Sequence, residues 1–501
     1  MESAAPARRA ALVTATLAGF LTPFMDSATT VALPAISQEF GMNAIQLSWI
    51  RMAYLLAAAA LLVPFGKLAD IWGRKRIFRI GISIFSAAAL LSGLSLSGPM
   101  LIASRVLLGA GNAMVFGTGV AILTSVYPPA ERGRVIGINV ASVYLGLSLG
   151  PTIGGFLTGT LGWRSLYFFS VPLGLVALAY VLFRLEGEWA EARGERLDVP
   201  GSLLYGLALT GVLFGFSRLP RAQGAVLIAA GLVGLAVFGA WELRARYPVL
   251  NVRLLAGNRT FAFSNLAALI HYSATSGIAF LLSLYLQYIH GLKPDRAGLV
   301  LIAQPIVMAV LSPAAGRMSD RIDARVLASA GMACTSAGLI ALCFLSEATP
   351  VWMLIVQLAF IGFGFALFSS PNTSAVMGSV EKQHYAVAYS TLSTMRLVGQ
   401  ALSMGIATLL FALVIGGLAI TPAVYPAFLV STKAAFAIFA VLCVGGVFAS
   451  LARGKSGEPG RSTAGPGLWL RKREAQRALG ETGEDENAER ELTQGAPASD
   501  R

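Results

Sequence analysis

The sequence predicts an all-α polytopic membrane protein with 14 transmembrane helices. Of its 501 residues, 56% are hydrophobic and 13% are charged, a composition too apolar for a soluble chain of this length. The mean hydropathy is +0.70, and the apolar residues fall into fourteen long runs. Because these runs are continuous rather than alternating, they favour helices over a β-barrel.

Each run approaches the length of about 20 residues that a helix needs to cross a bilayer. We expect the first eight spans at 10–33, 47–65, 77–96, 100–123, 135–157, 166–183, 199–216 and 222–241. The other six are expected at 261–288, 297–315, 326–345, 351–368, 387–414 and 433–451. No small-residue cleavage site follows the first run, so we interpret it as a retained span and not as a signal peptide.

Positive charge is distributed unequally between the two sides of the predicted membrane. The amino terminus and the loops on its side carry twenty Lys and Arg residues, and the opposite loops carry six. By the positive-inside rule, both termini are expected in the cytoplasm of a multi-pass protein of the cell (inner) membrane. This topology accounts for most of the net charge of +13 and argues against nucleic-acid binding.

Two similar loops indicate an internal repeat. Gly66-Lys67-Leu68-Ala69-Asp70 follows the second span, and Gly316-Arg317-Met318-Ser319-Asp320-Arg321 follows the tenth. This repeat suggests two six-helix bundles with two helices inserted between them. The expected parts are an amino-terminal segment at 1–9, a bundle at 10–184, the inserted pair at 185–258, a second bundle at 259–452 and a largely disordered tail at 453–501.

The first of these loops has the composition of a conformational latch. Its candidate gate residues are Gly66, Asp70, Gly73, Arg74 and Lys75. Glycine lets the backbone turn tightly between two spans, and a carboxylate can form ion pairs that break when the bundles move. An ordinary positively charged loop would explain the cations but not the Gly-Asp-Gly spacing.

The fifth span carries closely spaced glycines around a proline, at Gly146, Gly150, Pro151, Gly154 and Gly155. Glycines four residues apart allow a neighbouring helix to approach closely, and a proline inside a helix removes a backbone hydrogen bond and bends it. From the residues alone, ordinary small-residue packing explains this pattern equally well.

These two motifs resemble those of a known family. The loop at 66–76 looks like the cytoplasmic motif of the major facilitator superfamily, and the segment at 146–155 resembles the antiporter motif of its drug:proton antiporters. With fourteen spans, the chain is similar to the fourteen-helix branch of these multidrug exporters. The resemblance extends over roughly residues 10–451, with further matches at Ala32-Leu33-Pro34 and at Arg396 to Ala401.

The resemblance implies alternating access in a twelve-helix core, with proton entry driving the efflux of lipophilic or cationic drugs and antibiotics. It also implies that Asp70 and its basic neighbours gate the inner face and that Arg105 takes part in proton transfer. The energy source would be the proton gradient, and no cofactor is expected. We expect a monomer in the lipid bilayer, although some relatives pass substrate to a periplasmic adaptor.

Three positions depart from the family pattern. Ile71 stands where relatives commonly have Arg, and Arg51 stands where a small polar residue is typical. Asp26 lies eight residues before Pro34, whereas the family acid lies nine before it, at the position of Met25 here. Since one residue turns a helix by about 100°, the sequence leaves open whether Asp26 faces a central cavity.

Charged residues within the apolar runs are the main candidates for function, because burying a charge in a membrane is costly. Asp26 is the one carboxylate in these runs, and Arg51 and Arg105 are expected at a similar depth. Asp26 and Arg105 are proton-coupling candidates, but a fixed ion pair that locks helices together is the alternative. His271 titrates near neutral pH and is either a coupling group or a packing residue. Arg396 either selects anionic substrates or bonds the bundles together.

Aromatic and polar residues within the spans are candidates for lining a substrate cavity, since such a surface suits large lipophilic compounds. Each of them could equally serve helix packing. The candidates are Tyr54, Tyr144, Tyr272, Tyr285, Gln287, Asn372 and Met395.

The leading hypothesis is therefore proton-coupled efflux of drug-like molecules. The alternatives are a dedicated exporter or symporter of one metabolite, such as a lipid, siderophore or antibiotic, and a non-transporting membrane receptor. Cys334, Cys343 and Cys443 lie within apolar runs, which predicts neither a disulfide framework nor a metal site. No nucleophile or nucleotide-binding motif is evident, so we do not expect an enzyme.

Overall fold

A computed structural model describes residues 4–128, 131–250, 252–319, 321–381 and 385–454. Nearly all of the tail predicted at 453–501, together with Asp320 in the second repeat loop, lies outside these ranges. The described residues contain helices and no strands. Fourteen of the helical runs among them are long and apolar enough to cross a membrane, as the sequence predicts.

The first eight spans are single helices. They are α1 (Ala4–Phe40), α2 (Ala44–Trp72), α3 (Arg74–Gly93), α4 (Gly98–Val126), α5 (Arg132–Leu161), α6 (Arg164–Phe183), α7 (Val199–Arg218) and α8 (Ala222–Glu242). The expected end of the first span at residue 33 is wrong, because α1 continues through Pro34 to Phe40. A proline inside a helix removes one backbone hydrogen bond, but α1 remains helical on both sides of Pro34.

The later spans are less regular. After the short α9 (Val252–Gly257), the ninth span is divided into α10 (Arg259–Thr275), α11 (Gly277–Leu284) and the π-helix η1 (Tyr285–Ile289). The tenth consists of α12 (Pro294–Leu301) and α13 (Ala303–Met318). The remaining elements are α14 (Ala324–Leu342), α15 (Val351–Gly378), α16 (Tyr385–Val414), the 3-10 turn η3 (Pro422–Val424) and α17 (Tyr425–Leu451).

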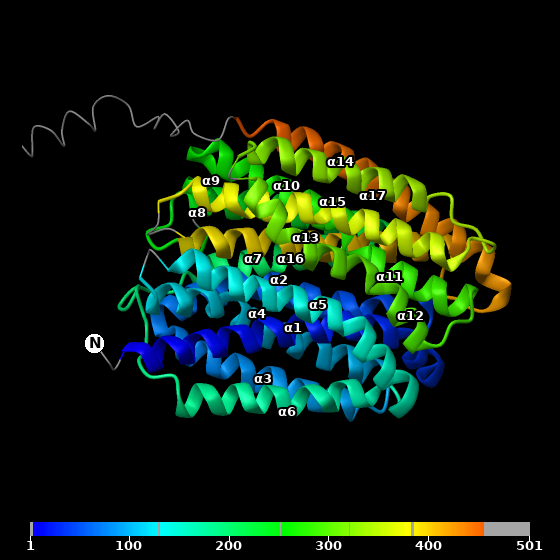
Figure 1. The fold of residues 1–501 in the computed structure, drawn as a ribbon, viewed down its shortest axis with the longest axis horizontal. Helices are drawn as coiled ribbons and strands as arrows, with labels where there is room; N and C mark the ends of the chain where they lie inside the picture. The colour runs from blue at the N-terminus through cyan, green and yellow to red at the C-terminus, as the bar shows by residue number, and fades with distance from the viewer. Residues whose placement is uncertain (1–3, 129–130, 251, 320, 382–384, 455–501) are drawn as a thin grey trace, which may run out of the picture. The chain divides into compact units, whose positions relative to one another are not determined.

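Figure 1 shows the helices running roughly along one common direction, with most of α1–α6 in the lower part of the view and most of α10–α17 in the upper part. We call these two sets the N-terminal half and the C-terminal half. The two ends of the helical unit are named after residues that they contain, the Arg74 end and the Glu39 end. The inserted α7 contacts both halves, because Phe214 packs 5.5 Å from the Trp49 ring of α2 and Phe216 lies beside Gly405 of α16.

Glycines bring neighbouring helices into close contact, as the fifth-span motif predicts. A Cβ on Gly150 would lie 2.7 Å from the Ser27 Cβ of α1, and a Cβ on Gly154 would lie 2.6 Å from the Ala28 Cβ. Gly146 faces the Phe20 carbonyl of the same helix. Gly155 lies on the opposite face of α5, where a Cβ would lie 2.5 Å from the Pro294 carbonyl oxygen at the start of α12. Thus α5 packs against α1 on one face and against the C-terminal half on the other.

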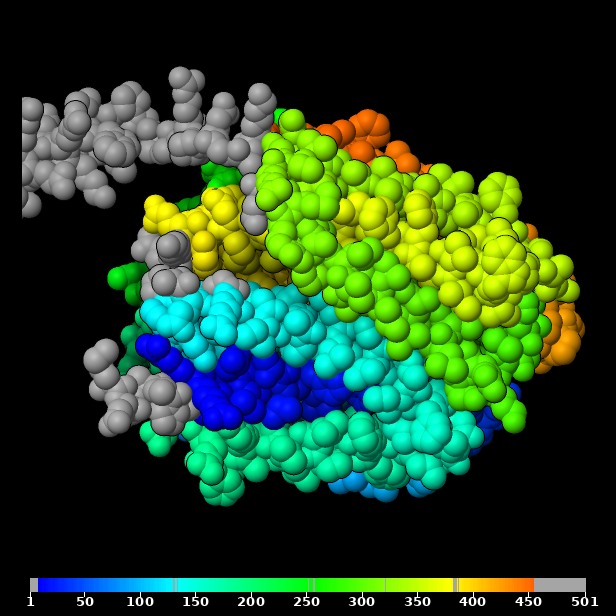
Figure 2. Space-filling model, viewed as in Figure 1, coloured from blue at the N-terminus to red at the C-terminus, as the bar shows by residue number. Residues whose placement is uncertain are grey.

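The two halves are joined most closely toward the Glu39 end. Figure 2 shows α5 in direct contact there with the segment that contains α12. Ser283 donates a hydrogen bond of 2.9 Å to the Thr30 carbonyl, and Gln287 donates one of 3.0 Å to the Val31 carbonyl. The backbone N–H of Ala44 donates to the Leu418 carbonyl at 3.2 Å. These hydrogen bonds cross from one half to the other and join the halves.

Candidate functional site

A cavity of about 100 Å³ lies between the two halves. Helices α1, α2, α4 and α5 form one wall, and α10, α15 and α16 form the other. The lining residues are Thr22, Pro23, Asp26, Tyr54, Asn112, Phe116, Val140, Val143, Tyr144, Leu147, Tyr272, Phe365, Tyr389, Arg396, Leu397 and Gln400. Pockets for drug-sized ligands usually have volumes of roughly 300–1,000 Å³, so a large substrate requires this cavity to widen.

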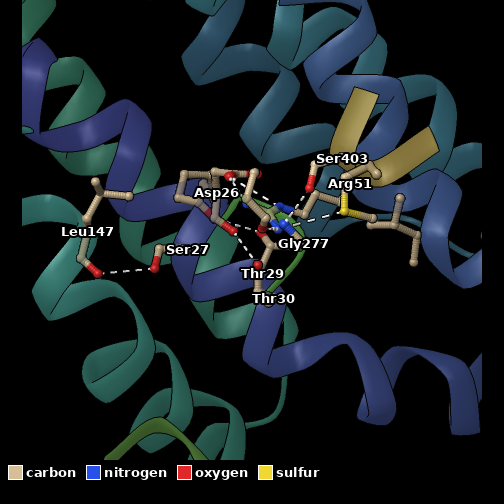
Figure 3. A network of polar contacts seen from close by, with 12 residues as sticks. Asp26, Ser27, Thr29, Thr30, Arg51, Leu147, Gly277 and Ser403 are labelled. Carbon is tan, nitrogen blue, oxygen red and sulfur yellow. Dashed lines mark hydrogen bonds and ion pairs between the residues drawn. The ribbon is translucent and has the colours of Figure 1, made fainter. Parts of the chain in front are cut away.

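Asp26 lines the cavity and contacts both of the arginines expected at its level. Arg51 donates to its Oδ2 through Nη2 at 3.1 Å and through Nε at 3.4 Å. The Arg105 Nη2 lies 3.5 Å from Oδ1, close enough for an ion pair. Figure 3 shows Asp26 and Arg51 directed toward one another. The one-residue offset from the family pattern therefore leaves the acid within the cavity wall.

Arg51 also reaches across to the C-terminal half. Its Nη1 donates to the Ser276 carbonyl at 2.8 Å and lies 3.8 Å from the Met404 sulfur. Ser276 is the residue between α10 and α11, and the next backbone N–H, that of Gly277, donates to the Ser403 hydroxyl at 2.9 Å (Figure 3). Side chains thus bind backbone groups where α10 meets α11 in the ninth span, and Arg51 links that junction to Asp26.

Arg105 is completely buried beside this pair. Its Nε donates to the Ile50 carbonyl at 3.0 Å, and its guanidinium carbon lies 4.6 Å from the centre of the Tyr54 ring. Among the described residues, neither of its Nη atoms has a hydrogen-bond partner. The N-terminal half therefore presents one carboxylate with two guanidinium groups around it.

Arg396 lies in the opposite wall. It donates from Nη2 to the Thr373 hydroxyl of α15 at 2.7 Å, and its guanidinium carbon lies 5.6 Å from the centre of the Tyr272 ring of α10. Nearby, the hydroxyl groups of Tyr144 and Ser369 are 2.7 Å apart and form a hydrogen bond between the halves. Arg396 and Tyr272 thus line the C-terminal wall of the cavity, and Tyr144 lines the N-terminal wall.

Four of the cavity candidates lie elsewhere. Tyr285 donates to the Ser346 carbonyl at 2.6 Å, and Gln287 takes part in the contact at the Glu39 end. Asn372 and Met395 do not line the cavity either.

His271 is buried beside two rings, with centroid distances of 4.8 Å to Phe365 and 4.0 Å to Phe368. Neither of its ring nitrogens has a partner among the described residues, and its coupling role stays a prediction.

Several residues that line the cavity were not among the candidates predicted from the sequence. These are mainly apolar or amide side chains, including Asn112, Phe116, Phe365, Tyr389 and Gln400. Gln400 follows Arg396 by one helical turn, and that spacing on one helix face is a signal by which it could have been found.

The predicted gate loop forms a dense ion-pair network at the Arg74 end. Arg74 is almost fully buried and donates to Asp70 Oδ1 from Nη2 at 2.7 Å and to Glu191 Oε1 from Nη1 at 2.7 Å. It also donates to the Ser125 hydroxyl. Gly73 has φ +114°, and a Cβ there would clash with Glu188. Gly66 has space, since the nearest atom to a Cβ is 3.8 Å away.

The partners of this loop come from the segment between α6 and α7, residues 184–198, which we call the linker. Lys67 forms an ion pair with Glu195 at 2.6 Å, and the backbone N–H of Lys75 donates to Glu188 at 2.9 Å. The Lys75 ammonium donates to the Leu185 carbonyl. The linker acids were missed in the sequence because nothing in their spacing identifies a partner more than 100 residues away.

Comparisons with known proteins agree with this architecture. Residues 15–261 and 265–484 match the sequence profile of the Major Facilitator Superfamily. The chain is 30% identical to the riboflavin transporter RibZ of Clostridioides difficile (strain 630), over 78% of this chain and 86% of that protein. It is also 30% identical to the multidrug resistance protein Stp of Mycobacterium tuberculosis (strain CDC 1551 / Oshkosh), over 78% of this chain and 74% of that one.

The fold is also found among solved structures. A bacterial homologue of the human lysosomal transporter Spinster, in an inward-facing and unoccupied conformation, matches with a TM-score of 0.60 and 20% identity. That match covers 90% of this chain and 97% of the other. The sequence profile covers most of the chain, and the helices have the arrangement of this fold. The protein therefore belongs to the major facilitator superfamily of membrane transporters.

Proposed function

We propose that this transporter exports lipophilic small molecules in exchange for protons. The observation that carries the proposal is the placement of Asp26, a carboxylate that lines a cavity between two halves and is held by two arginines. The name of the multidrug resistance relative supports this substrate class. The positively charged loops favour a cytoplasmic location for the Arg74 end.

In the proposed cycle, a proton binds Asp26 and removes its negative charge. Arg51 then loses its charged partner, which weakens the link that it forms between α1 and the junction of α10 and α11. That link joins the two halves, so protonation changes how firmly they are held together. Release of the proton restores the ion pair. Coupling arises because the carboxylate and the contact between the halves share one guanidinium group.

Transport into everted membrane vesicles tests the proposal. Vesicles that contain the wild-type protein should accumulate ethidium when their interior is made acidic, and vesicles with Asp26→Asn should accumulate no more than vesicles that lack the protein. Asp26→Glu, which keeps the carboxylate, should retain part of the activity. Equilibrium binding of ethidium to detergent-solubilised Asp26→Asn should persist, because the amide leaves the apolar walls unchanged.

Two results would oppose the proposal. Full gradient-driven accumulation by Asp26→Asn would remove Asp26 from coupling. Accumulation by the wild-type protein that does not depend on the pH difference would remove proton exchange altogether.

A second candidate is transport of one dedicated metabolite. It is favoured by the small cavity and by the riboflavin transporter among the relatives. Riboflavin flux in the same vesicles separates the two proposals, since a transporter dedicated to riboflavin should transport riboflavin but not ethidium.

A further inference from the structure

Arg396 is the cation of the cavity wall that lacks a carboxylate partner. Within the described residues it forms no ion pair, and its Nε has no hydrogen-bond partner. Its nearest groups are the Thr373 hydroxyl and the Tyr272 ring. By contrast, Arg51 and Arg105 share the charge of Asp26. An unpaired guanidinium within a membrane is costly, and its retention at a cavity calls for a functional explanation.

A bond between the bundles does not explain it in this conformation. Arg396 lies on α16, Thr373 on α15 and Tyr272 on α10, and all three helices belong to the C-terminal half. The hydrogen bond that crosses the cavity is instead that between Tyr144 and Ser369. Arg396 is therefore held by its own half and borders the cavity.

The cavity and its supports carry an excess of positive charge. Asp26 is the one carboxylate in the lining formed by the described residues, and three guanidinium groups lie in or directly behind the same walls. An anionic ligand reduces this excess, whereas a cation increases it. In a medium of low dielectric constant this difference strongly affects affinity.

The surroundings of Arg396 also suit the rest of such a ligand. Tyr272 and Phe365 contribute two aromatic rings to the lining, with centroids 5.4 Å apart and planes at 89°. Gln400 contributes an amide one helical turn beyond Arg396. A guanidinium group presents a planar fork of donors that matches a carboxylate. We propose that Arg396 is the binding site for the carboxylate of an aromatic acid, with Tyr272 and Phe365 packing on the ring system. This proposal rests on the function proposed above and adds a preference within it, since aromatic acids should bind more tightly than cations such as ethidium.

Binding of three matched probes to the purified full-length protein tests it. The probes are 2-naphthoate, its methyl ester and 2-naphthylmethylammonium, which share a ring and differ in charge. By isothermal titration calorimetry, the wild-type protein should bind 2-naphthoate roughly ten- to a hundredfold more tightly than the ester, the range expected for charge-assisted hydrogen bonds. Arg396→Gln should lose this preference and keep its affinity for the ester, and Arg396→Lys should keep part of it.

Arg296→Gln is the matched control, because its side chain is 73% exposed outside the cavity and the charge change is the same. It should leave all three affinities unchanged. Retained ester binding shows that a variant is folded. If both Arg396 variants fail to fold, the preference of the wild-type protein for 2-naphthoate decides the matter.

The proposal is overturned if the wild-type protein binds the ester or the ammonium probe as tightly as 2-naphthoate. It is equally overturned if Arg396→Gln keeps the preference, or if 2-naphthoate does not bind at about 1 mM, a concentration at which even weak sites are half occupied. These titrations use no proton gradient. Their failure is therefore distinguishable from a failure of proton exchange, which only the vesicle assay detects.

Discussion

The Asp26 site and the Arg74 site are opposite arrangements of the same two chemical groups. At Asp26, one carboxylate is shared by two guanidinium groups, Arg51 and Arg105. At Arg74, one guanidinium is shared by two carboxylates, Asp70 and Glu191. The first cluster is buried throughout, whereas the two acids of the second are 32% and 67% exposed. The Asp26 cluster therefore has an excess of positive charge, and the Arg74 cluster has an excess of negative charge.

The two sites also connect different parts of the molecule. Arg51 links α1 and α2 to the C-terminal half at Ser276, so its contacts depend on how the halves are placed. Arg74 binds α2 and α4 and the linker, which all lie on the N-terminal side of α7. The buried site is therefore positioned to sense movement between the halves. The exposed site stabilises one half and its linker.

The largest effect on stability is expected for Arg74→Gln. The substitution removes the guanidinium group that both acids share, so Asp70 and Glu191 lose their common cation. We expect a loss of about 3 kcal/mol, at the lower end for breaking a buried ion pair, because the acids can still reach water. Thermal unfolding in detergent, followed by intrinsic fluorescence, measures it. A midpoint equal to that of the wild-type protein would show that the network is not a structural latch.

A smaller effect is expected for Arg51→Gln, because Asp26 keeps Arg105 as a partner. Loss of the charged hydrogen bonds should destabilise the protein by about 1.5–3 kcal/mol and should loosen the Glu39 end. Labelling of a cysteine introduced at Thr30, in an otherwise cysteine-free background, should accelerate relative to the same background with Arg51 intact. Unchanged labelling would mean that Arg51 does not hold the halves together.

Gly150→Ala should affect the Asp26 site and leave the Arg74 site unchanged. Its methyl group would press on Ser27 of α1, next to Asp26, and leaves the Arg74 end untouched. We expect a loss of about 1–2 kcal/mol from overpacking, with proton-driven transport reduced more than ethidium binding. Gly137→Ala in the same helix, α5, is the control, since a Cβ there would have no neighbouring atom within 4 Å. Equal losses in both variants would contradict a specific role for the contact between α1 and α5.

The smallest effect is expected for Glu191→Gln. Glu191 is 67% exposed, and Arg74 keeps Asp70 as a partner, so the loss should stay below about 1 kcal/mol. It should shrink further in high salt, because exposed ion pairs are screened. A loss as large as that of Arg74→Gln would show that the linker acid, rather than Asp70, is the main partner.

Much of this architecture was predictable from local sequence patterns. The fourteen spans follow from continuous apolar runs, and Asp26 stands out because it is the one acid within them. The close contact of α5 with α1 was expected from Gly146, Gly150 and Gly154. The junction of α10 and α11 at Ser276 was not expected, since it depends on hydrogen bonds from Arg51 and to Ser403, which lie on other helices.

The sequence by itself determined the membrane class, the number of spans and the residues whose charge has to be compensated. These properties depend on the free energy of transferring each segment from water to lipid, which composition sets locally. Only the tertiary structure decided which charges compensate each other. Asp26 meets two arginines, Arg74 meets the linker acid Glu191, and Arg396 meets none of the described carboxylates. Pairing depends on distances of a few ångströms between helices far apart in the chain, and helix packing sets those distances.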